Sequence, residues 1–274
     1  MLTDTHCHMY LEQFAGDIDD VIWRATEAGV VKMLVPGMDL ETSREAIRLA
    51  ETHTNIFAAA GYHPTDMQKF SQENFDEICR LVEHPKVIAI GEIGLDYYWV
   101  KEPEKRIEQR QNLLPHLELA KQVNKPVILH LREENDAWFG AASVDLLNIL
   151  ADWQKDLSGA LADKPGVLHS FNGTLETAQK ALALNFYIGI TGPITYKKAD
   201  RKREIVAQLP LEKLLIETDS PFLAPAPFRS KRNEPANVGL IADKIAEVHR
   251  TTREAVAQIT TANANRLFGW EAYA

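Results

Sequence analysis

Histidine and acidic side chains recur along the chain at positions that suit metal binding. His6 and His8 are two residues apart, so on a β-strand both imidazoles point to the same face. Such a pair is a weak signal alone, but residues of the same kind follow several apolar runs later in the sequence. Six of them have side chains that bind divalent metals in proteins: His6, His8, Glu92, His130, His169 and Asp219.

The number of these ligands predicts more than one metal. Six ligands exceed what a single tetrahedral zinc needs, because a catalytic site keeps one position open. Two metals that share a bridging group can activate a water between them, and a carboxylate has two oxygens with which to bridge. We therefore predict one metal on His6, His8, Asp219 and Glu92, and a second on Glu92, His130 and His169.

Asp219 has a further candidate role. A carboxylate beside a metal-bound water is well placed to accept its proton, so Asp219 and Glu92 are the candidate catalytic residues. Alternatively, Asp219-Ser220-Pro221 is typical of a helix N-cap followed by proline. Four other histidines lie in segments with helical character, and we predict them to be surface residues: His53, His84, His116 and His249.

Eight short apolar or β-branched runs would position these side chains. Near-continuous apolar runs, each followed by a longer helical segment, are typical of parallel strands buried on both faces. Eight such units over residues 1–274 favour a single α/β domain, a (β/α)8 TIM barrel, with a capping helix from Thr251 to Phe268. A doubly wound sheet is the alternative. In a barrel, however, all the C-terminal strand ends meet on one face. The runs begin near Leu2, Val31, Ile56, Val87, Pro126, Val167, Phe186 and Leu214.

Composition and charge narrow the function classes. The chain has 274 residues, of which 45% are hydrophobic, and 30 basic residues against 39 acidic ones give a net charge of −9. This balance excludes a protein that coats nucleic acid through bulk basicity. It does not exclude an enzyme that contacts phosphate through metal ions and a few rim residues. The apolar runs are too short for a membrane span, the N-terminus has no signal-peptide pattern, and two cysteines are too few for a disulfide framework. We expect a cytoplasmic protein.

The candidate ligands lie in motifs that occur in order over nearly the whole chain. They are HCH at 6–8, GYHP at 61–64, GEIGLDYY at 91–98, KPVILHLR at 125–132, LHSFNG at 168–173, ETDSP at 217–221 and RSKRNEP at 229–235. This set resembles the TatD family, metal-dependent hydrolases of the amidohydrolase superfamily. The resemblance implies a cytoplasmic TIM-barrel enzyme that uses divalent Mg, Mn or Zn. It also implies deoxyribonuclease activity, often as a 3′-to-5′ exonuclease. By motif match, the six residues above ligate metal and His63 contacts phosphate.

Other candidate substrate contacts lie around these motifs. Arg132 and the pair Arg229 and Arg232 are candidate phosphate contacts, with a structural salt bridge as the alternative for Arg132. The aromatic residues at 97–99 would either stack on a nucleobase or pack as a lid. The segment 133–143 is predicted to be a longer loop than the family pattern has, which would reshape the substrate rim.

The sequence therefore predicts a two-metal phosphodiesterase that acts on DNA, on single strands or ends, as a monomer without an obligate protein partner. The alternative keeps the metal centre but hydrolyses an amide, a lactone or another small-molecule ester, as cyclic amidohydrolases of the same superfamily do. Many of those enzymes bridge their metals with a carbamylated lysine on the fourth strand, where this sequence has Glu92. A non-catalytic barrel would have lost ligands, and none is missing.

Overall fold

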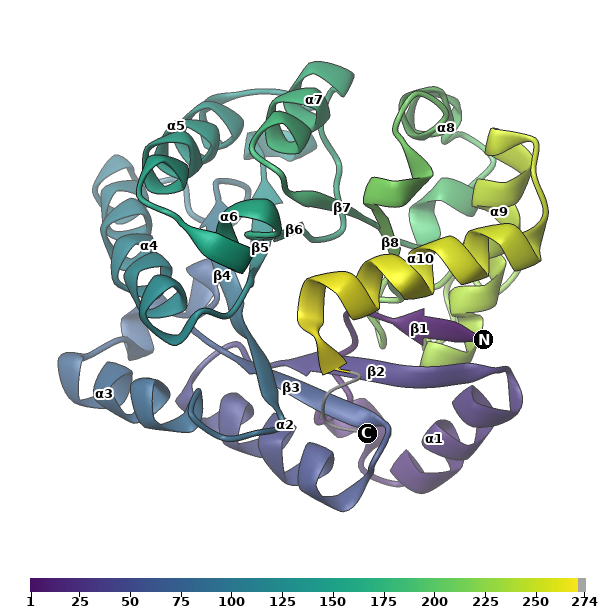
Figure 1. Cartoon of the computed structure of the whole chain (residues 1–274), viewed down its shortest axis with the longest axis horizontal. Coiled ribbons are helices and arrows are strands. Elements are labelled where there is room, and N and C mark those ends of the chain that lie inside the picture. The colour runs from purple at the N-terminus through teal and green to yellow at the C-terminus, as the bar shows by residue number, and fades with distance from the viewer. Residues whose placement is uncertain (271–274) are drawn as a thin grey trace.

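The computed structural model describes residues 1–270 and contains an eight-stranded parallel sheet in the order β1 to β8 (Figure 1). The strands are β1 (Leu2–Asp4), β2 (Val30–Pro36), β3 (Ile56–Ala60), β4 (Val87–Asp96), β5 (Val127–Arg132), β6 (Gly166–Leu168), β7 (Tyr187–Ile190) and β8 (Leu214–Ile216). The helices are α1 (Ile18–Glu27), α2 (Leu40–Thr52), α3 (Gln72–Leu81), α4 (Pro103–Val123), α5 (Ala141–Lys155), α6 (Gly159–Asp163), α7 (Leu175–Ala183), α8 (Asp200–Val206), α9 (Val238–His249) and α10 (Arg253–Phe268). The predicted TIM barrel is confirmed.

The barrel closes through the residues that follow β1 and β8. The Thr5 N–H donates to the Ile216 carbonyl at 3.2 Å, and the Asp219 N–H donates to the His6 carbonyl at 2.8 Å. Cys7 and Ser220 form an isolated parallel bridge between the two segments. Closing the ring therefore places the first and the last predicted ligands side by side.

The interior of the barrel is filled with apolar side chains and closed at one end by α10. The Thr252 hydroxyl caps this helix by accepting the Ala255 N–H at 3.1 Å, close to the predicted start at Thr251. Figure 1 shows α10 lying across the barrel. The buried cluster that joins the strands to this helix consists of Leu34, Phe57, Ala59, Ile88, Ala89, Ile128, Val167, Tyr187, Leu215, Ala264, Leu267, Phe268 and Trp270.

β4 and β5 extend beyond the apolar runs that predicted them, which end at Ile90 and Leu129. β4 continues past an irregularity between Ile90 and Ile93, and Gly94 then pairs with His130 of β5. Gly94 has φ of +140°, and a Cβ there would lie 2.1 Å from the His130 carbonyl oxygen, so the two strands approach closely only because this residue is glycine. Glu92 and His130 consequently lie within strands, and the Glu92 N–H, in the irregular stretch of β4, donates to the Gly37 carbonyl at 2.8 Å.

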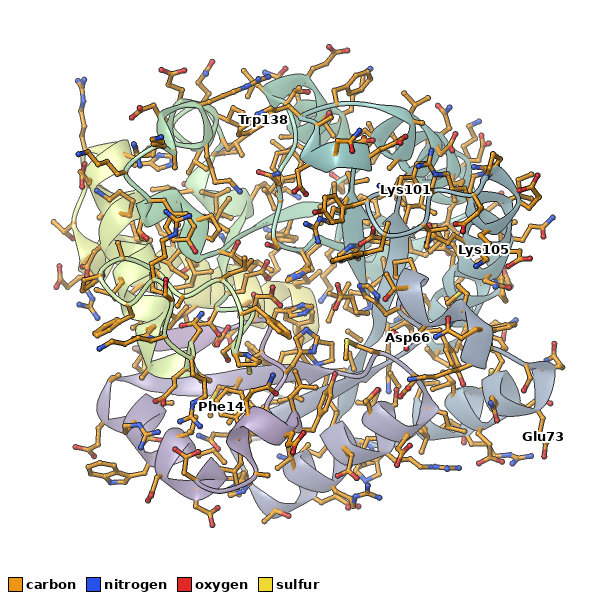
Figure 2. All side chains as sticks on the ribbon, turned by 180° about the vertical axis from the view of Figure 1, so that it is seen from behind. Phe14, Asp66, Glu73, Lys101, Lys105 and Trp138 are labelled. Carbon is orange, nitrogen blue, oxygen red and sulfur yellow. The ribbon has the colours of Figure 1, made fainter. Side chains whose placement is uncertain are left out.

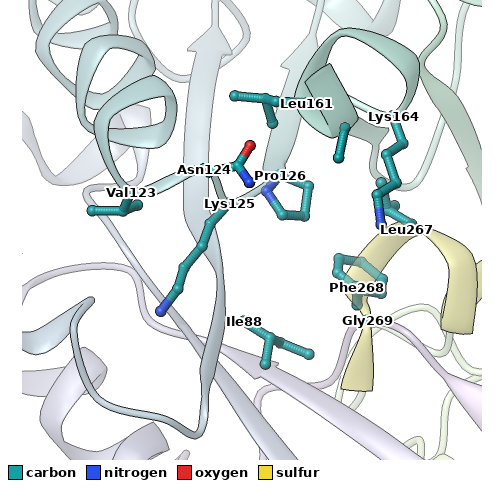
Figure 3. A pocket seen from close by; sticks show the side chains of 11 residues that line it. Ile88, Val123, Asn124, Lys125, Pro126, Leu161, Lys164, Leu267, Phe268 and Gly269 are labelled. Atoms are coloured by element: carbon teal, nitrogen blue, oxygen red, sulfur yellow. The ribbon is translucent and has the colours of Figure 1, made fainter. Parts of the chain in front are cut away.

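The opposite end of the barrel carries a separate pocket of about 250 Å³ (Figure 3). Ile88 of β4, Pro126 before β5 and Phe268 of α10 line it, so it lies at the N-terminal ends of the strands. The pocket is therefore remote from the predicted ligands, which lie towards the C-terminal strand ends. None of the helices within residues 1–270 has the length and apolar character needed to cross a membrane.

Candidate metal centre

The predicted ligands converge at the C-terminal mouth of the barrel. His6 and His8 follow β1, His169 follows β6 and Asp219 follows β8, whereas Glu92 and His130 project from β4 and β5. In Figure 2, which shows the molecule from behind, the labelled side chains Phe14, Asp66, Lys101 and Trp138 surround this mouth. They belong to the segments after β1, β3, β4 and β5.

Glu92 lies at the centre of the cluster. Its side chain is almost fully buried, and its two oxygens face different histidines. Oε2 lies 3.2 Å from His6 Nε2 and 3.6 Å from His8 Nε2. Oε1 lies 2.9 Å from His130 Nδ1, 3.6 Å from His63 Nε2 and 3.8 Å from His169 Nε2. The carboxylate thus separates the imidazoles into two groups.

Asp219 completes the first group. Its Oδ1 lies 3.4 Å from His8 Nε2 and 3.8 Å from both His6 Nε2 and His169 Nε2. The chain continues from Ser220 as an irregular loop, and the next helical turn starts only at Pro235. Asp219 is therefore not the N-cap of a helix, which was the alternative interpretation of its sequence.

The donor set fits a divalent cation. His6 Nε2 and His8 Nε2 are 3.1 Å apart, and the His6 and His169 rings stack with centroids 3.4 Å apart. Imidazole nitrogens and carboxylate oxygens crowded together in a buried space are the ligands of zinc and other first-row metals. Within residues 1–270, three groups have ligand atoms within 4.8 Å of one another, and Glu92 belongs to two of them: His6, His8 and Glu92; His63, Glu92 and His130; His6, His169 and Glu217.

The electrostatics of the cluster also favour positive charge at its centre. Burial disfavours a charged imidazole, but the hydrogen bonds that His130 donates to Asp96 and Glu92 raise its pKa to about 9. Likewise, the charges of Glu217 and Glu92 outweigh burial and raise the pKa of His169 to about 10. The surrounding histidines hold the pKa of Glu92 well below its usual range despite its burial. The carboxylates therefore stabilise cationic charge where metals would bind.

Two buried carboxylates that we did not predict as site residues orient the histidines from behind. Glu217 Oε1 lies 3.0 Å from His169 Nδ1 and accepts the Ser170 N–H. Asp96 Oδ2 lies 3.0 Å from His130 Nε2. Such carboxylate–histidine contacts fix the ring of a metal ligand. The signal that could have identified Asp96 is spacing, because it follows Glu92 by four residues on β4, and residues at even spacing on a strand share a face.

His63 also lies in the cluster, as the neighbour of His130. Its Nδ1 accepts the Thr65 N–H at 3.2 Å, so the ring proton is on Nε2, which lies 3.6 Å from Glu92 Oε1. Burial lowers the pKa of His63 to about 3, so the ring is neutral. A neutral Nε2–H group that points into the site can donate a hydrogen bond to an anionic ligand.

The three predicted arginine contacts have different environments. Arg132 lies over the Tyr98 ring at 3.8 Å and pairs with Asp136 at 2.8 Å. Arg229 lies over the Tyr196 ring at 4.5 Å, in the exposed loop after β8.

Arg232 instead lies between two carboxylates. Its guanidinium pairs with Asp17 and Glu234, both at 2.7 Å, and lies 4.9 Å from the Phe14 ring. These ion pairs favour a structural role for Arg232 over the predicted substrate contact.

The loop that follows β5 is held in place at several points. The Glu133 carboxylate accepts N–H groups at the start of α5, and Glu134 pairs with Arg106 of α4 at 3.1 Å. Trp138 lies under the Arg201 guanidinium of α8 at 4.4 Å. This segment therefore forms a fixed wall on one side of the mouth rather than a free loop.

Comparisons with known proteins show the family to which the chain belongs. The family model "TatD related DNase" matches residues 3–269. The "Uncharacterized metal-dependent hydrolase YabD" of Bacillus subtilis (strain 168) is 41% identical over 268 residues, covering 98% of this chain and 99% of the relative. The "3'-5' ssDNA/RNA exonuclease TatD" of Escherichia coli (strain K12) is 35% identical over 272 residues, covering 97% and 98%.

A solved structure shows the same fold. The crystal structure of YJJV, a TatD homologue from Escherichia coli K12, has a TM-score of 0.87 and 32% identity, with 98% of each chain covered. The match of sequence and fold extends over the whole barrel, including every strand that contributes to the metal centre. This chain belongs to the TatD family of metal-dependent hydrolases.

Proposed function

We propose that this protein hydrolyses phosphodiester bonds at the 3′ ends of single-stranded DNA, with two divalent metal ions. The observation that carries the proposal is the position of Glu92, whose two oxygens face separate groups of imidazoles. The substrate class is supported by relatives named as 3′-5′ ssDNA/RNA exonucleases. Many cyclic amidohydrolases bridge their two metals with a modified lysine on the fourth strand. The presence of Glu92 at this place on β4 favours a phosphodiesterase over an amidase or lactonase.

Two sets of residues would hold the metals. His6, His8, Asp219 and Glu92 would bind one, and Glu92, His130 and His169 the other. When bound, such ions supply a Lewis acid for the phosphoryl oxygen and lower the pKa of a coordinated water. Glu217 and Asp96 keep the His169 and His130 rings in place from behind.

Side chains of the protein would accept the proton of the attacking water and bind the phosphate. Burial opposes ionisation of Asp219, but its hydrogen bond to His8 and the nearby histidines lower its pKa, so it is a carboxylate at neutral pH. It would accept the proton of the attacking water. His63 Nε2–H would donate to a non-bridging phosphate oxygen. Arg132 and Arg229 at the rim would contact the neighbouring phosphates.

A substrate panel tests this proposal. Oligonucleotides labelled at the 5′ end, simple phosphodiesters, lactones and dipeptides are assayed with Mg²⁺, Mn²⁺ and Zn²⁺ in turn. We expect a ladder of products that shorten from the 3′ end of single strands, and slower cleavage of blunt duplexes. Activity confined to the amides or lactones would overturn the proposal.

We further propose that the enzyme acts in the cytoplasm as a monomer. Cys7 and Cys79 are both free thiols, as expected in a reducing compartment. Analytical ultracentrifugation with and without metal tests the monomer, and cell fractionation tests the compartment.

A further inference from the structure

Two large aromatic side chains are exposed on opposite sides of the metal centre. Trp99 follows β4 and is 67% exposed, and Phe222 follows β8 and is 48% exposed. Because β4 and β8 are four positions apart in a ring of eight strands, they lie across the barrel from each other. An exposed aromatic ring leaves a large apolar surface in water, so two of them at the mouth suggest a ligand that covers both.

Trp99 is fixed to the side of the site that contains His130. Its backbone N–H donates to Asp96 Oδ1 at 2.8 Å, and the other oxygen of this carboxylate contacts His130. The Tyr98 ring packs edge-on against the indole with centroids 4.9 Å apart, and the Arg132 guanidinium lies 5.9 Å from the indole. The exposed face of Trp99 is therefore held still beside a cationic group.

Phe222 is fixed to the opposite side of the site. Its ring centroid lies 6.3 Å from that of His8, and its backbone N–H donates to the Asp219 carbonyl at 2.9 Å. The buried Asn233 side chain donates to the Phe222 carbonyl at 2.8 Å and to the Thr218 carbonyl at 2.9 Å. The backbone that carries the exposed ring is thus tied to the loop that positions Asp219.

The order of groups across the mouth is aromatic ring, metal-binding cluster, aromatic ring. A nucleotide strand presents the same order, because a phosphate separates each base from the next. Proteins that hold single strands stack bases on aromatic side chains, and this is possible only for bases that are not paired. An apolar protein partner is a poor match, since the charged cluster would lie beneath it.

We propose that Trp99 and Phe222 each stack on the base of one of the two nucleotides that flank the scissile phosphate. The proposal rests on the proposed function and adds the way in which the enzyme recognises an unpaired 3′ end. It predicts that the two terminal bases, rather than the phosphates alone, contribute to binding.

Cleavage of abasic oligonucleotides tests the proposal. Three single strands are compared: one intact, one without the 3′-terminal base, and one without the penultimate base. Trp99→Ala and Phe222→Ala should each lower kcat/KM for the intact strand roughly 5- to 150-fold, the range that stacking on one aromatic residue gives. Each variant should then match the wild type on one of the two abasic strands. Trp99→Phe and Phe222→Tyr should retain most of the activity.

Trp23→Ala is the matched control, because Trp23 is 62% exposed but lies on the outer helix α1. It should behave as the wild type on every strand. Wild-type kcat/KM in both alanine variants at the mouth would overturn the proposal. An equal loss on all three strands would also overturn it, because that pattern indicates a structural effect.

A binding assay separates this inference from the proposed function. Tryptophan fluorescence is titrated with a phosphorothioate-protected single strand in the presence of Mg²⁺. We expect quenching in the wild type and in Trp23→Ala, and its loss in Trp99→Phe. If the wild type cleaves no oligonucleotide, the proposed function fails, and the titration alone decides: quenching that depends on Trp99 supports stacking, and its absence refutes stacking.

Discussion

Glu92→Gln is the most direct test of the shared carboxylate. The substitution keeps the size of the side chain but replaces one oxygen with an NH2 group, which has no lone pair for a metal. In the structure Oε2 faces His6 and His8, whereas Oε1 faces His130, His63 and His169. Whichever way the amide points, one of the two groups loses an oxygen ligand.

The size of the effect follows from what remains on each side. The group of His6, His8 and Asp219 keeps three protein ligands without Glu92, but the group of His130 and His169 keeps only two. The second metal should therefore be lost first, and stoichiometry should fall from two metals to one. A metal contributes several kcal/mol of charge stabilisation in the transition state. Losing about 4 kcal/mol lowers kcat about 10³-fold.

The assay measures metal content after equilibrium dialysis against Mn²⁺, together with hydrolysis of a 5′-labelled single strand. Glu133→Gln is the control, because Glu133 is a similarly buried carboxylate that only caps α5. It should keep two metals and near-normal turnover. The reasoning is wrong if Glu92→Gln also binds two metals and retains more than a tenth of the wild-type kcat.

Other perturbations test the metals and the rim. A chelator should abolish hydrolysis and added Mg²⁺ or Mn²⁺ should restore it, whereas undiminished activity would rule out a metal mechanism. Metal affinity, measured by calorimetry, should rise from pH 7 towards 9–10, because His130 and His169, with pKa values of about 9 and about 10, must lose a proton to ligate; a flat profile contradicts this. Arg232→Ala should lower the free energy of unfolding by about 1 kcal/mol with kcat/KM nearly unchanged. Arg229→Ala should leave stability unchanged but reduce the slope of log KM against log salt by roughly 0.7. If instead Arg229→Ala lowers stability and Arg232→Ala reduces the salt slope, Arg232 is the substrate contact and Arg229 is structural.

The convergence of the candidate ligands was predictable, because the topology of a barrel determines where the ends of its strands lie. His6 and Asp219 are more than two hundred positions apart, yet both follow strands, and the closure between β1 and β8 makes them neighbours. The exact ends of the strands could be predicted less well from the sequence. The apolar run of β4 stops at Ile90, but the strand continues because Gly94 permits a close approach to His130.

The side-chain partners of charged residues could not be predicted, because they depend on packing between distant segments. Arg232 lies in a motif beside the site, but Asp17, from the segment before α1, pairs with its guanidinium. Glu217 has no sequence feature that distinguishes it from a surface acid until the structure places it behind His169. The prediction that His116 is a surface residue was wrong, since α4 buries it against Phe75 with ring centroids 4.8 Å apart.

The net charge of −9 does not describe the mouth of the barrel, where several arginines lie. At the mouth, Arg132, Arg201 and Arg229 each lie over an aromatic ring, at 3.8, 4.4 and 4.5 Å. The ring contacts fix these cations at the rim; Arg132 in addition pairs with Asp136 at 2.8 Å. If these three contact phosphates, at about 0.7 per contact on a single strand, the slope of log affinity against log salt is roughly −2. A slope of that size is expected for an enzyme that binds only a few nucleotides at the end of a strand. Acidic side chains elsewhere on the surface repel the phosphates farther along the same strand.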